Sequence, residues 1–235
     1  MTTSAPIPGK ARRKNADASL PSPQSSEVLL ATAQRLFAEK GLDAVSMREI
    51  AREAGQRNNS ALHYHFGSKE ALVEAILQRG MQKFDALRVE YLDRIHLARR
   101  DGELRAVAEA IVWPLATGLA TPSMNSYIRF LAAAQIHPDI DLVASTHEDG
   151  ERGFRRVQTM LEQVLPALPP SVLRQRYLAG VAFVIFSLAD FERIKTRRGR
   201  SQRGFDLQRA IENLIDMLCG ALAAPVSEQV VQRLA

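Results

Sequence analysis

The chain has 235 residues, of which 46% are hydrophobic and 24% charged, so it is long and apolar enough to bury a real core and is not a largely disordered protein. Cys219 is the only cysteine, which excludes an internal disulfide and a multi-cysteine metal site and is typical of a reducing cytoplasm. A formal net charge of +5 suits a polyanionic partner without identifying one.

The N-terminal 25 residues are polar and rich in proline, and they hold no apolar stretch that would serve as a signal peptide. We expect residues 1–25 to form a disordered basic arm. Two interpretations of the arm stay open: it reaches DNA phosphates or a minor groove, or it is only a solubilising tail. Its cations are Lys10, Arg12, Arg13 and Lys14.

Residues 26–72 are expected to form a helix-turn-helix unit, because short segments of helical periodicity alternate here with glycine-containing turns. Ser25 or Ser26 is expected to cap the first helix. Ser46 and Glu49 form the pattern of a capping box, and Gly55 ends the second helix. The expected helices cover residues 26–40, 46–54 and 59–65, and a fourth runs from Ser68 to about Arg99.

Residues 73–225 are expected to form a second, larger domain, again of helices only, followed by a tail at 226–235. No stretch alternates between apolar and polar residues as a half-buried strand does, so the predicted fold class is all-α. The longest apolar run, residues 178–189, spans 12 residues, whereas a membrane-spanning helix needs about 20. We interpret it as a buried core helix. Trp113-Pro114 predicts a kink, and the remaining helices are expected at 103–120, 123–136, 139–165, 171–196 and 205–222.

The stretch His63-Tyr64-His65-Phe66 raises three hypotheses: a metal site, a catalytic site and a nucleic-acid interface. His63 and His65 are two positions apart, so on a helix they point roughly 200° away from each other and do not share one ion. No nucleophile elbow, paired carboxylates or phosphate loop accompanies them, so no enzyme signature is found and no cofactor is expected.

A nucleic-acid interface explains the stretch best. Leu62 and Phe66 are expected to pack inward, which leaves polar side chains on the outer surface of a short helix, where they reach base edges and phosphates. Lys69 adds a cation at the start of the next helix. For His65, a structural role at the helical corner stays an equal alternative. The predicted DNA contacts are Ser46, Arg48, Arg57, Asn58, Asn59, Ser60, His63, Tyr64, His65 and Lys69.

The segment SMREIAREAGQRNNSALHYHFGSKEALVEAI resembles the DNA-binding region of the Tet-repressor family of bacterial regulators. Ser46, Ile50-Ala51, Ala54-Gly55, His65-Phe66 and Lys69-Glu70 with Leu72 fall on the family pattern in register. The chain departs from that pattern at Gln56 to Asn59 and at His63, so no operator sequence carries over. The resemblance implies a transcriptional regulator, most simply a repressor released by an effector, working in the cytoplasm as a homodimer on double-stranded DNA.

The last helices carry the predicted dimer contacts. Leu207, Ile211, Leu214 and Leu218 form an apolar seam on the final long helix, and the preceding helix is apolar around much of its circumference. Family dimers pair these two helices, which adds Phe183 to the predicted interface and implies a near-palindromic operator. The alternative is a bundle closed within one chain.

Effector binding follows mainly from the resemblance, which implies a small molecule, hydrophobic or amphipathic, held in the second domain. Each candidate lining residue has plain core packing as its alternative. The alternative function is a ligand-sequestering helical protein whose DNA-binding motif has lost its role. The arginine-rich segment 193–203 is interpreted as a solvated loop rather than a second nucleic-acid site. The candidate lining residues are Trp113, Met124, Tyr127, Phe130, Met160, Phe183 and Phe186.

Overall fold

The computed structural model describes residues 23–56, 60–121, 126–142, 152–196 and 204–234. Every regular element in these ranges is a helix, so the all-α prediction is confirmed. Within the same ranges, no helix is long and apolar enough to cross a membrane.

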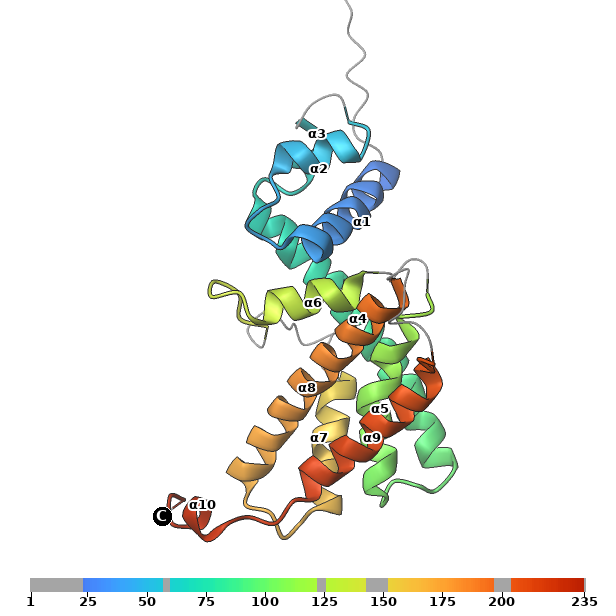
Figure 1. Ribbon diagram of the computed structural model, residues 1–235, viewed down its shortest axis with the longest axis vertical. Coiled ribbons are helices and arrows are strands. Elements are labelled where there is room, and N and C mark those ends of the chain that lie inside the picture. The colour runs from blue at the N-terminus through green and yellow to red at the C-terminus, as the bar shows by residue number, and fades with distance from the viewer. Residues whose placement is uncertain (1–22, 57–59, 122–125, 143–151, 197–203, 235) are drawn as a thin grey trace, which may run out of the picture.

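Three helices lie together at one end of the elongated molecule (Figure 1). They are α1 (Pro23–Lys40), α2 (Met47–Glu53) and α3 (Ser60–His65). The long helix α4 (Lys69–Leu97) begins among them and runs into the second group of helices. Both groups therefore share one continuous helix.

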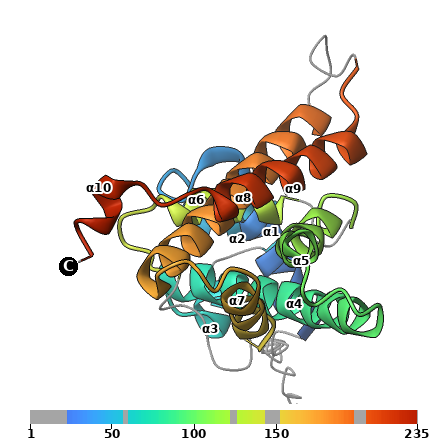
Figure 2. The same ribbon diagram turned by 90° about the horizontal axis from the view of Figure 1, so that it is seen from below.

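In the second group, α5 and α7 pack against the remainder of α4, and Figure 2 shows α8 and α9 side by side on the face opposite α4 and α7. Helix α6 lies between this group and α1, and it packs against both α1 and α8. The helices are α5 (Leu104–Thr117), α6 (Tyr127–Gln135), α7 (Arg152–Val164), α8 (Pro170–Thr196), α9 (Leu207–Ala223) and the short α10 (Glu228–Val231).

One local prediction needs correction. Helix α1 begins at Pro23, so Ser25 and Ser26 lie inside it and are not at its N-cap position; proline is favoured in the first helical turn because its missing N–H has no intrahelical acceptor there. Pro114 lies inside α5, which continues past it to Thr117. The basic arm at 1–22 and the segment 143–151 of one expected helix lie outside the described residues.

An aromatic cluster joins the two groups of helices. The Phe130 ring of α6 lies with its centroid 6.1 Å from that of Phe37 in α1 and 5.8 Å from that of Tyr127. The Tyr127 ring in turn lies 5.3 Å from Phe84 in α4. All four side chains are buried. Because offset and tilted aromatic pairs are favourable, the cluster ties α1, α4 and α6 into one core.

The closest approach in this cluster is between the Tyr127 ring and Gly80 of α4. A Cβ atom at Gly80 would lie only 1.9 Å from Tyr127 Cζ, so no larger residue fits without moving the ring. The Tyr127 hydroxyl donates to the Leu77 carbonyl oxygen at 3.2 Å, and burial raises the pKa of this phenol above its usual value.

Helix α7 is held to α4 by a buried carboxylate. Asp85 accepts hydrogen bonds from the backbone N–H groups of Gly153, at 2.9 Å, and Phe154, at 3.1 Å, which are the otherwise unpaired donors in the first turn of α7. Arg88 pairs with Asp85 at 3.3 Å and lies over the Phe154 ring. The start of α7 is thereby fixed against α4.

We expect Gly80→Ala to lower the free energy of unfolding by roughly 1–3 kcal/mol, because the added methyl group overpacks against the Tyr127 ring. Chemical denaturation followed by circular dichroism measures this loss. Gly102→Ala is the control, since a Cβ there meets nothing within 4 Å. Equal stability of the two variants would show that the Gly80–Tyr127 contact is not tight.

Candidate nucleic-acid interface

The second helix of the predicted helix-turn-helix begins with a side-chain cap. The Ser46 hydroxyl accepts from the Glu49 backbone N–H at 3.2 Å. A hydrogen bond from Lys40 at 2.7 Å, together with one from the Ser46 backbone, holds the pKa of the Glu49 carboxyl below its usual value. The capping box expected from the sequence is therefore present, and it orients the first turn of α2.

The turn after α2 is closed by Gly55 in the left-handed region, at φ 72°. Its N–H donates to the Arg52 carbonyl at 3.1 Å, and the Gln56 N–H donates to the Ala51 carbonyl at 2.9 Å. This pair of bonds is the Schellman arrangement, which suits glycine because it has no Cβ. Arg57, Asn58 and Asn59, three of the predicted DNA contacts, lie outside the described residues, as does the side chain of Ser60.

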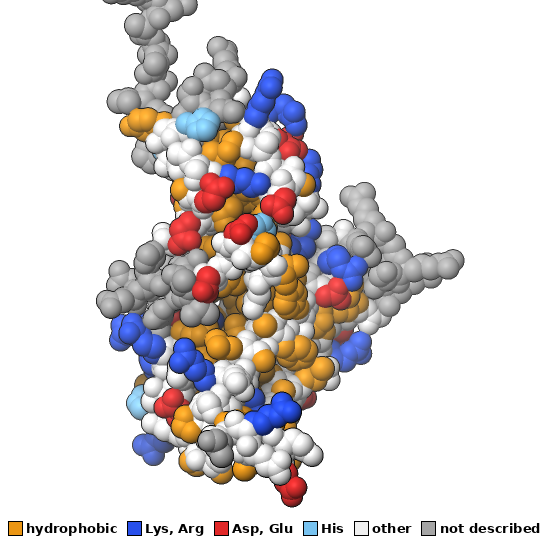
Figure 3. All heavy atoms as spheres, turned by 90° about the vertical axis from the view of Figure 1, so that its left-hand side faces the viewer, with side chains coloured by type: hydrophobic (Ala, Val, Ile, Leu, Met, Phe, Trp, Pro, Cys, Tyr) orange, Lys and Arg blue, Asp and Glu red, His pale blue; other side chains and the backbone are white. Residues whose placement is uncertain are grey.

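Helix α3 has one buried side and one exposed side. Leu62 is fully buried against the core of the three-helix unit, whereas Tyr64 is 66% exposed. His63 is also exposed, and its Nδ1 lies 3.0 Å from the Gly67 carbonyl oxygen, so the ring is held against the helix end with Nε2 directed elsewhere. Figure 3 shows a histidine side chain at the surface near this end of the molecule. Two hydrogen-bonding side chains are thus presented outward by a rigid helix.

His65 is placed differently from its neighbours. It is half-buried, and its ring contacts the rings of Tyr64, at 5.4 Å between centroids, and Phe66, at 5.9 Å. Its Nε2 atom is buried without a hydrogen-bond partner in the part of the chain that the structure describes. The packing favours the structural role at the helical corner over a direct DNA contact.

The fourth helix begins beside α3 with its own cap. The Ser68 hydroxyl accepts from the Ala71 N–H at 3.1 Å. The side chain of Lys69 turns back, so that its ammonium group lies 5.9 Å from the centroid of the Phe37 ring and near Asp43. Arg48, on α2, is by contrast exposed. Arg48 is therefore the better placed of these two cations for a phosphate.

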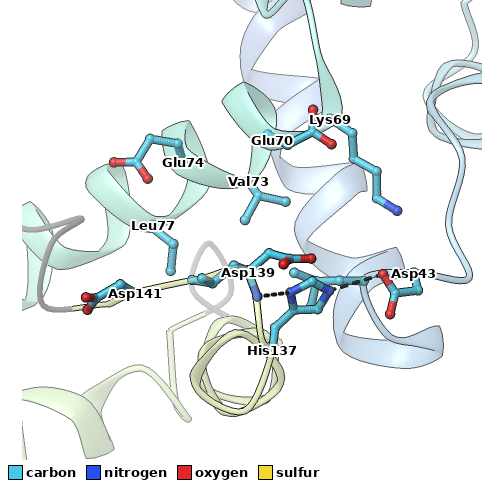
Figure 4. A pocket seen from close by; sticks show the side chains of 11 residues that line it. Asp43, Lys69, Glu70, Val73, Glu74, Leu77, His137, Asp139 and Asp141 are labelled. Atoms are coloured by element: carbon cyan, nitrogen blue, oxygen red, sulfur yellow. Dashed lines mark hydrogen bonds and ion pairs between the residues drawn. The ribbon is translucent and has the colours of Figure 1, made fainter.

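A pocket of about 260 Å³ lies where the three-helix unit meets the second group (Figure 4). His137 Nε2 lies 3.1 Å from Asp43 across this junction, and that hydrogen bond holds the pKa of the Asp43 carboxyl below its usual value. None of the predicted effector-lining residues lines this pocket. Its walls are Leu42, Asp43, Lys69, Glu70, Val73, Glu74, Leu77, His137, Asp139, Ile140 and Asp141.

The predicted effector-lining residues are not gathered in one place. Tyr127 and Phe130 belong to the aromatic core, as the alternative interpretation anticipated, and Phe186 is 41% exposed on the outside of α8. Met160 is buried in α7, and Trp113 and Phe183 are partly buried. Met124 lies outside the described residues.

The predicted dimer seam also needs correction. Ile211, Leu214 and Leu218 are buried in the core of their own protomer, and Leu207 and Phe183 are only partly buried against it. The spacing identified the apolar side of α9 correctly, but this side faces α5 and α8. The apolar side chains that α8 and α9 leave exposed are Leu178, Phe186 and Met217, and hydrophobic side chains gather on the face shown in Figure 3.

The described residues contain no group of three or more His, Cys, Asp or Glu side chains placed to hold a metal ion. What the structure does assemble is a small helical unit, capped and turned at defined residues, that presents the outer side of α3. This is the architecture of a helix-turn-helix DNA-binding protein with a separate helical domain.

Comparison with known proteins identifies the family. A family model described as bacterial regulatory proteins of the tetR family matches residues 29–76, and one described as a tetracyclin repressor-like C-terminal domain matches residues 109–221. The two ranges together cover well over half of the chain. The chain belongs to the tetR family of bacterial regulatory proteins.

Curated relatives match only part of the chain. The HTH-type transcriptional repressor KstR2 of Rhodococcus jostii (strain RHA1) is 50% identical over 50 residues, which are 21% of this chain and 24% of that protein. KstR2 of Mycobacterium tuberculosis (strain ATCC 25618 / H37Rv) is 41% identical over 88 residues, 35% of this chain and 42% of that protein. The chain thus matches less than half the length of these relatives.

Solved structures share the fold. A tetR family transcription regulator from Shewanella sp. PV-4 superposes with a TM-score of 0.55 and 19% sequence identity, over 84% of this chain and 97% of that one. At this identity the likeness shows the fold alone, which extends through the second domain as well as the first.

The two sides of α3 are expected to respond differently to truncation. Leu62→Ala should lower the free energy of unfolding by about 2–5 kcal/mol, because it leaves a cavity under the helix. Tyr64→Ala, in the same helix, should change it by no more than about 0.5 kcal/mol, since the side chain is exposed. Urea denaturation compares them, and equal losses would mean that Tyr64 is packed rather than presented to a ligand.

Proposed function

We propose that this protein is a transcriptional repressor that binds a near-palindromic operator as a dimer and releases it when a small hydrophobic or amphipathic effector binds. The observation that carries the DNA-binding part is the polar outer side of α3: Tyr64 and His63 are exposed while Leu62 anchors the helix beneath them. A protein with this task works in the cytoplasm, where the chromosome is.

Repression, rather than activation, is supported by the relatives. Both KstR2 proteins are named transcriptional repressors, and they are 50% and 41% identical to this chain over the residues that match. A repressor does not have to contact another protein. By occupying an operator tightly, it prevents other proteins from binding the same DNA.

Phosphate contacts are assigned to cations and capped helix ends around α3. Ser46, at the start of α2, and Arg48, two residues further, lie on the three-helix unit that carries α3. Arg57, Asn58, Asn59 and Ser60 stay proposed contacts on sequence grounds, because they directly precede or begin α3. Lys69 joins the set as a phosphate contact that must first leave the Phe37 ring.

The dimer is supported by the exposed apolar side chains of α8 and α9. Leu178, Phe186 and Met217 each expose at least two fifths of their surface, which is unfavourable in water. A twofold axis through this face would bring identical surfaces together and place two copies of α3 at the same end of the assembly. Recognition helices one DNA turn apart then read a near-palindrome.

An effector site is proposed in the second domain, between α4, α7 and α8. Met160 and Phe183 stay candidates for its lining, and an apolar lining favours a hydrophobic or amphipathic molecule. Such a molecule weakens DNA binding if it binds more tightly to the conformation in which the recognition helices are wrongly spaced.

The test is binding of the purified protein to fluorescent DNA from upstream of its own gene, with excess unrelated duplex as competitor. We expect competitor-resistant binding with two subunits, or a multiple of two, at each site. If neither this DNA nor a random-sequence library yields a complex, the protein is instead a helical ligand-binding protein with a non-functional DNA-binding motif.

Arg48→Gln is expected to weaken operator binding and to reduce the slope of log affinity against log salt concentration by about 2, because each dimer loses two phosphate contacts, one from each subunit. Fluorescence anisotropy at several salt concentrations measures both quantities. Arg99→Gln is the control, because Arg99 is exposed beyond the far end of α4. Identical slopes for wild type and Arg48→Gln would remove Arg48 from the interface.

A further inference from the structure

Residues 224–234, which we call the α10 segment, leave the body of the protein after α9. Their path is fixed at its root by Arg176 of α8, whose guanidinium donates to the Leu222 carbonyl at 2.9 Å and to the Pro225 carbonyl at 3.3 Å. Figures 1 and 2 both show α10 standing clear of the other helices, beyond the start of α8. The segment therefore leaves α9 in a defined direction.

The α10 segment exposes several apolar side chains, although it is too short to form a stable helix by itself. Val230 is 40% exposed, Val231 53% and Leu234 43%, and no residue of α10 is buried. A helix of four residues does not hold together in water by itself, because too few hydrogen bonds offset the cost of forming its first turn. An apolar cover is needed to keep it folded.

Among the described residues, no other helix of the same protomer covers α10, which stands clear of the rest. The side chains that need covering on the body are those already described on α8 and α9, namely Leu178, Phe186 and Met217. Leu178 lies two residues along α8 from Arg176, so it is at the same height as the root of the α10 segment, although the two side chains point to different sides of α8.

Symmetry decides which surface α10 meets. A twofold axis that places both copies of α3 at one end preserves heights along the molecule, so the α10 segment faces the partner at its own level. At that level, opposite the DNA-binding end, the body presents the first half of α8, which includes Leu178 (Figure 1).

We propose that the α10 segment of each protomer packs on the first half of α8 of a second copy of this chain, so that the two segments clasp the dimer reciprocally. The inference rests on the proposed dimer and goes beyond it, because it assigns the α10 segment to the partner rather than to its own protomer. The apolar side chains Val230, Val231 and Leu234 would supply the contact.

Hydrogen–deuterium exchange tests the assignment. In the wild-type dimer, the backbone amides of residues 230–234 should exchange at least tenfold more slowly than in an unfolded peptide. In the double variant Phe186→Glu/Met217→Glu, made monomeric by charges in the exposed face, the same amides should exchange as in an unfolded peptide. Circular dichroism and sedimentation velocity confirm that this variant is folded and monomeric.

A second measurement uses the α10 segment itself. The triple variant Val230→Ser/Val231→Ser/Leu234→Ser should raise the dimer dissociation constant at least tenfold in sedimentation equilibrium. Leu97→Ser is the matched control, because Leu97 is 82% exposed at the end of α4 and should leave the constant unchanged.

The outcomes separate the clasp from the dimer. Protection of residues 230–234 that persists in the monomeric variant would assign the segment to its own protomer and overturn the inference. Absence of protection in a wild-type dimer would leave the segment free and overturn it too, with the proposed function intact. A wild-type protein that is monomeric at all concentrations would overturn the proposed dimer together with the clasp.

Discussion

The carboxylate of Glu192 fixes α6 to α8, and the arrangement of the two domains depends on α6 because it packs against both α1 and α8. It is almost completely buried in α8 and accepts from Arg129 Nε at 2.7 Å and from the Ser126 backbone N–H at 3.1 Å. Both donors belong to the start of α6, where Ser126 has a left-handed backbone with φ 69°. A buried charge is tolerated only when it is paired and hydrogen-bonded, so these partners fix α6 firmly to α8.

Two joints of different chemistry connect α6 and its surroundings to the DNA-binding end. The buried contact is aromatic: Phe130 contacts Phe37, and both are fully buried. The exposed contact is the pair of His137 with Asp43, whose carboxylate is open to solvent. A hydrogen bond to an exposed carboxylate contributes little net stability, whereas the aromatic contact is fully buried, so the aromatic contact stabilises this junction more.

Local rules accounted for the elements that depend on neighbours in sequence. The cap at Ser46 and the turn at Gly55 rest on interactions within a few residues, and both were predictable. The ties of Glu192 to Arg129 and of Asp85 to Gly153 join residues more than sixty positions apart, and no spacing rule finds them. Periodicity likewise identified the apolar side of α9 without showing whether core or partner covers it. The buried and exposed sides of α3 could be predicted because its apolar and polar residues follow helical spacing.

Helix α4 is divided into two unequal parts by Gly80, which is in close contact with the Tyr127 ring about two fifths of the way along the helix. With a rise of about 1.5 Å per residue, Lys69 lies roughly 16 Å from Gly80 and Leu97 roughly 25 Å. A tilt of about 5° about Gly80 moves Lys69 by roughly 1.4 Å and Leu97 by roughly 2.2 Å in the opposite direction. A displacement at the Leu97 end of α4 would therefore reach the three-helix unit with the opposite direction and a smaller amplitude.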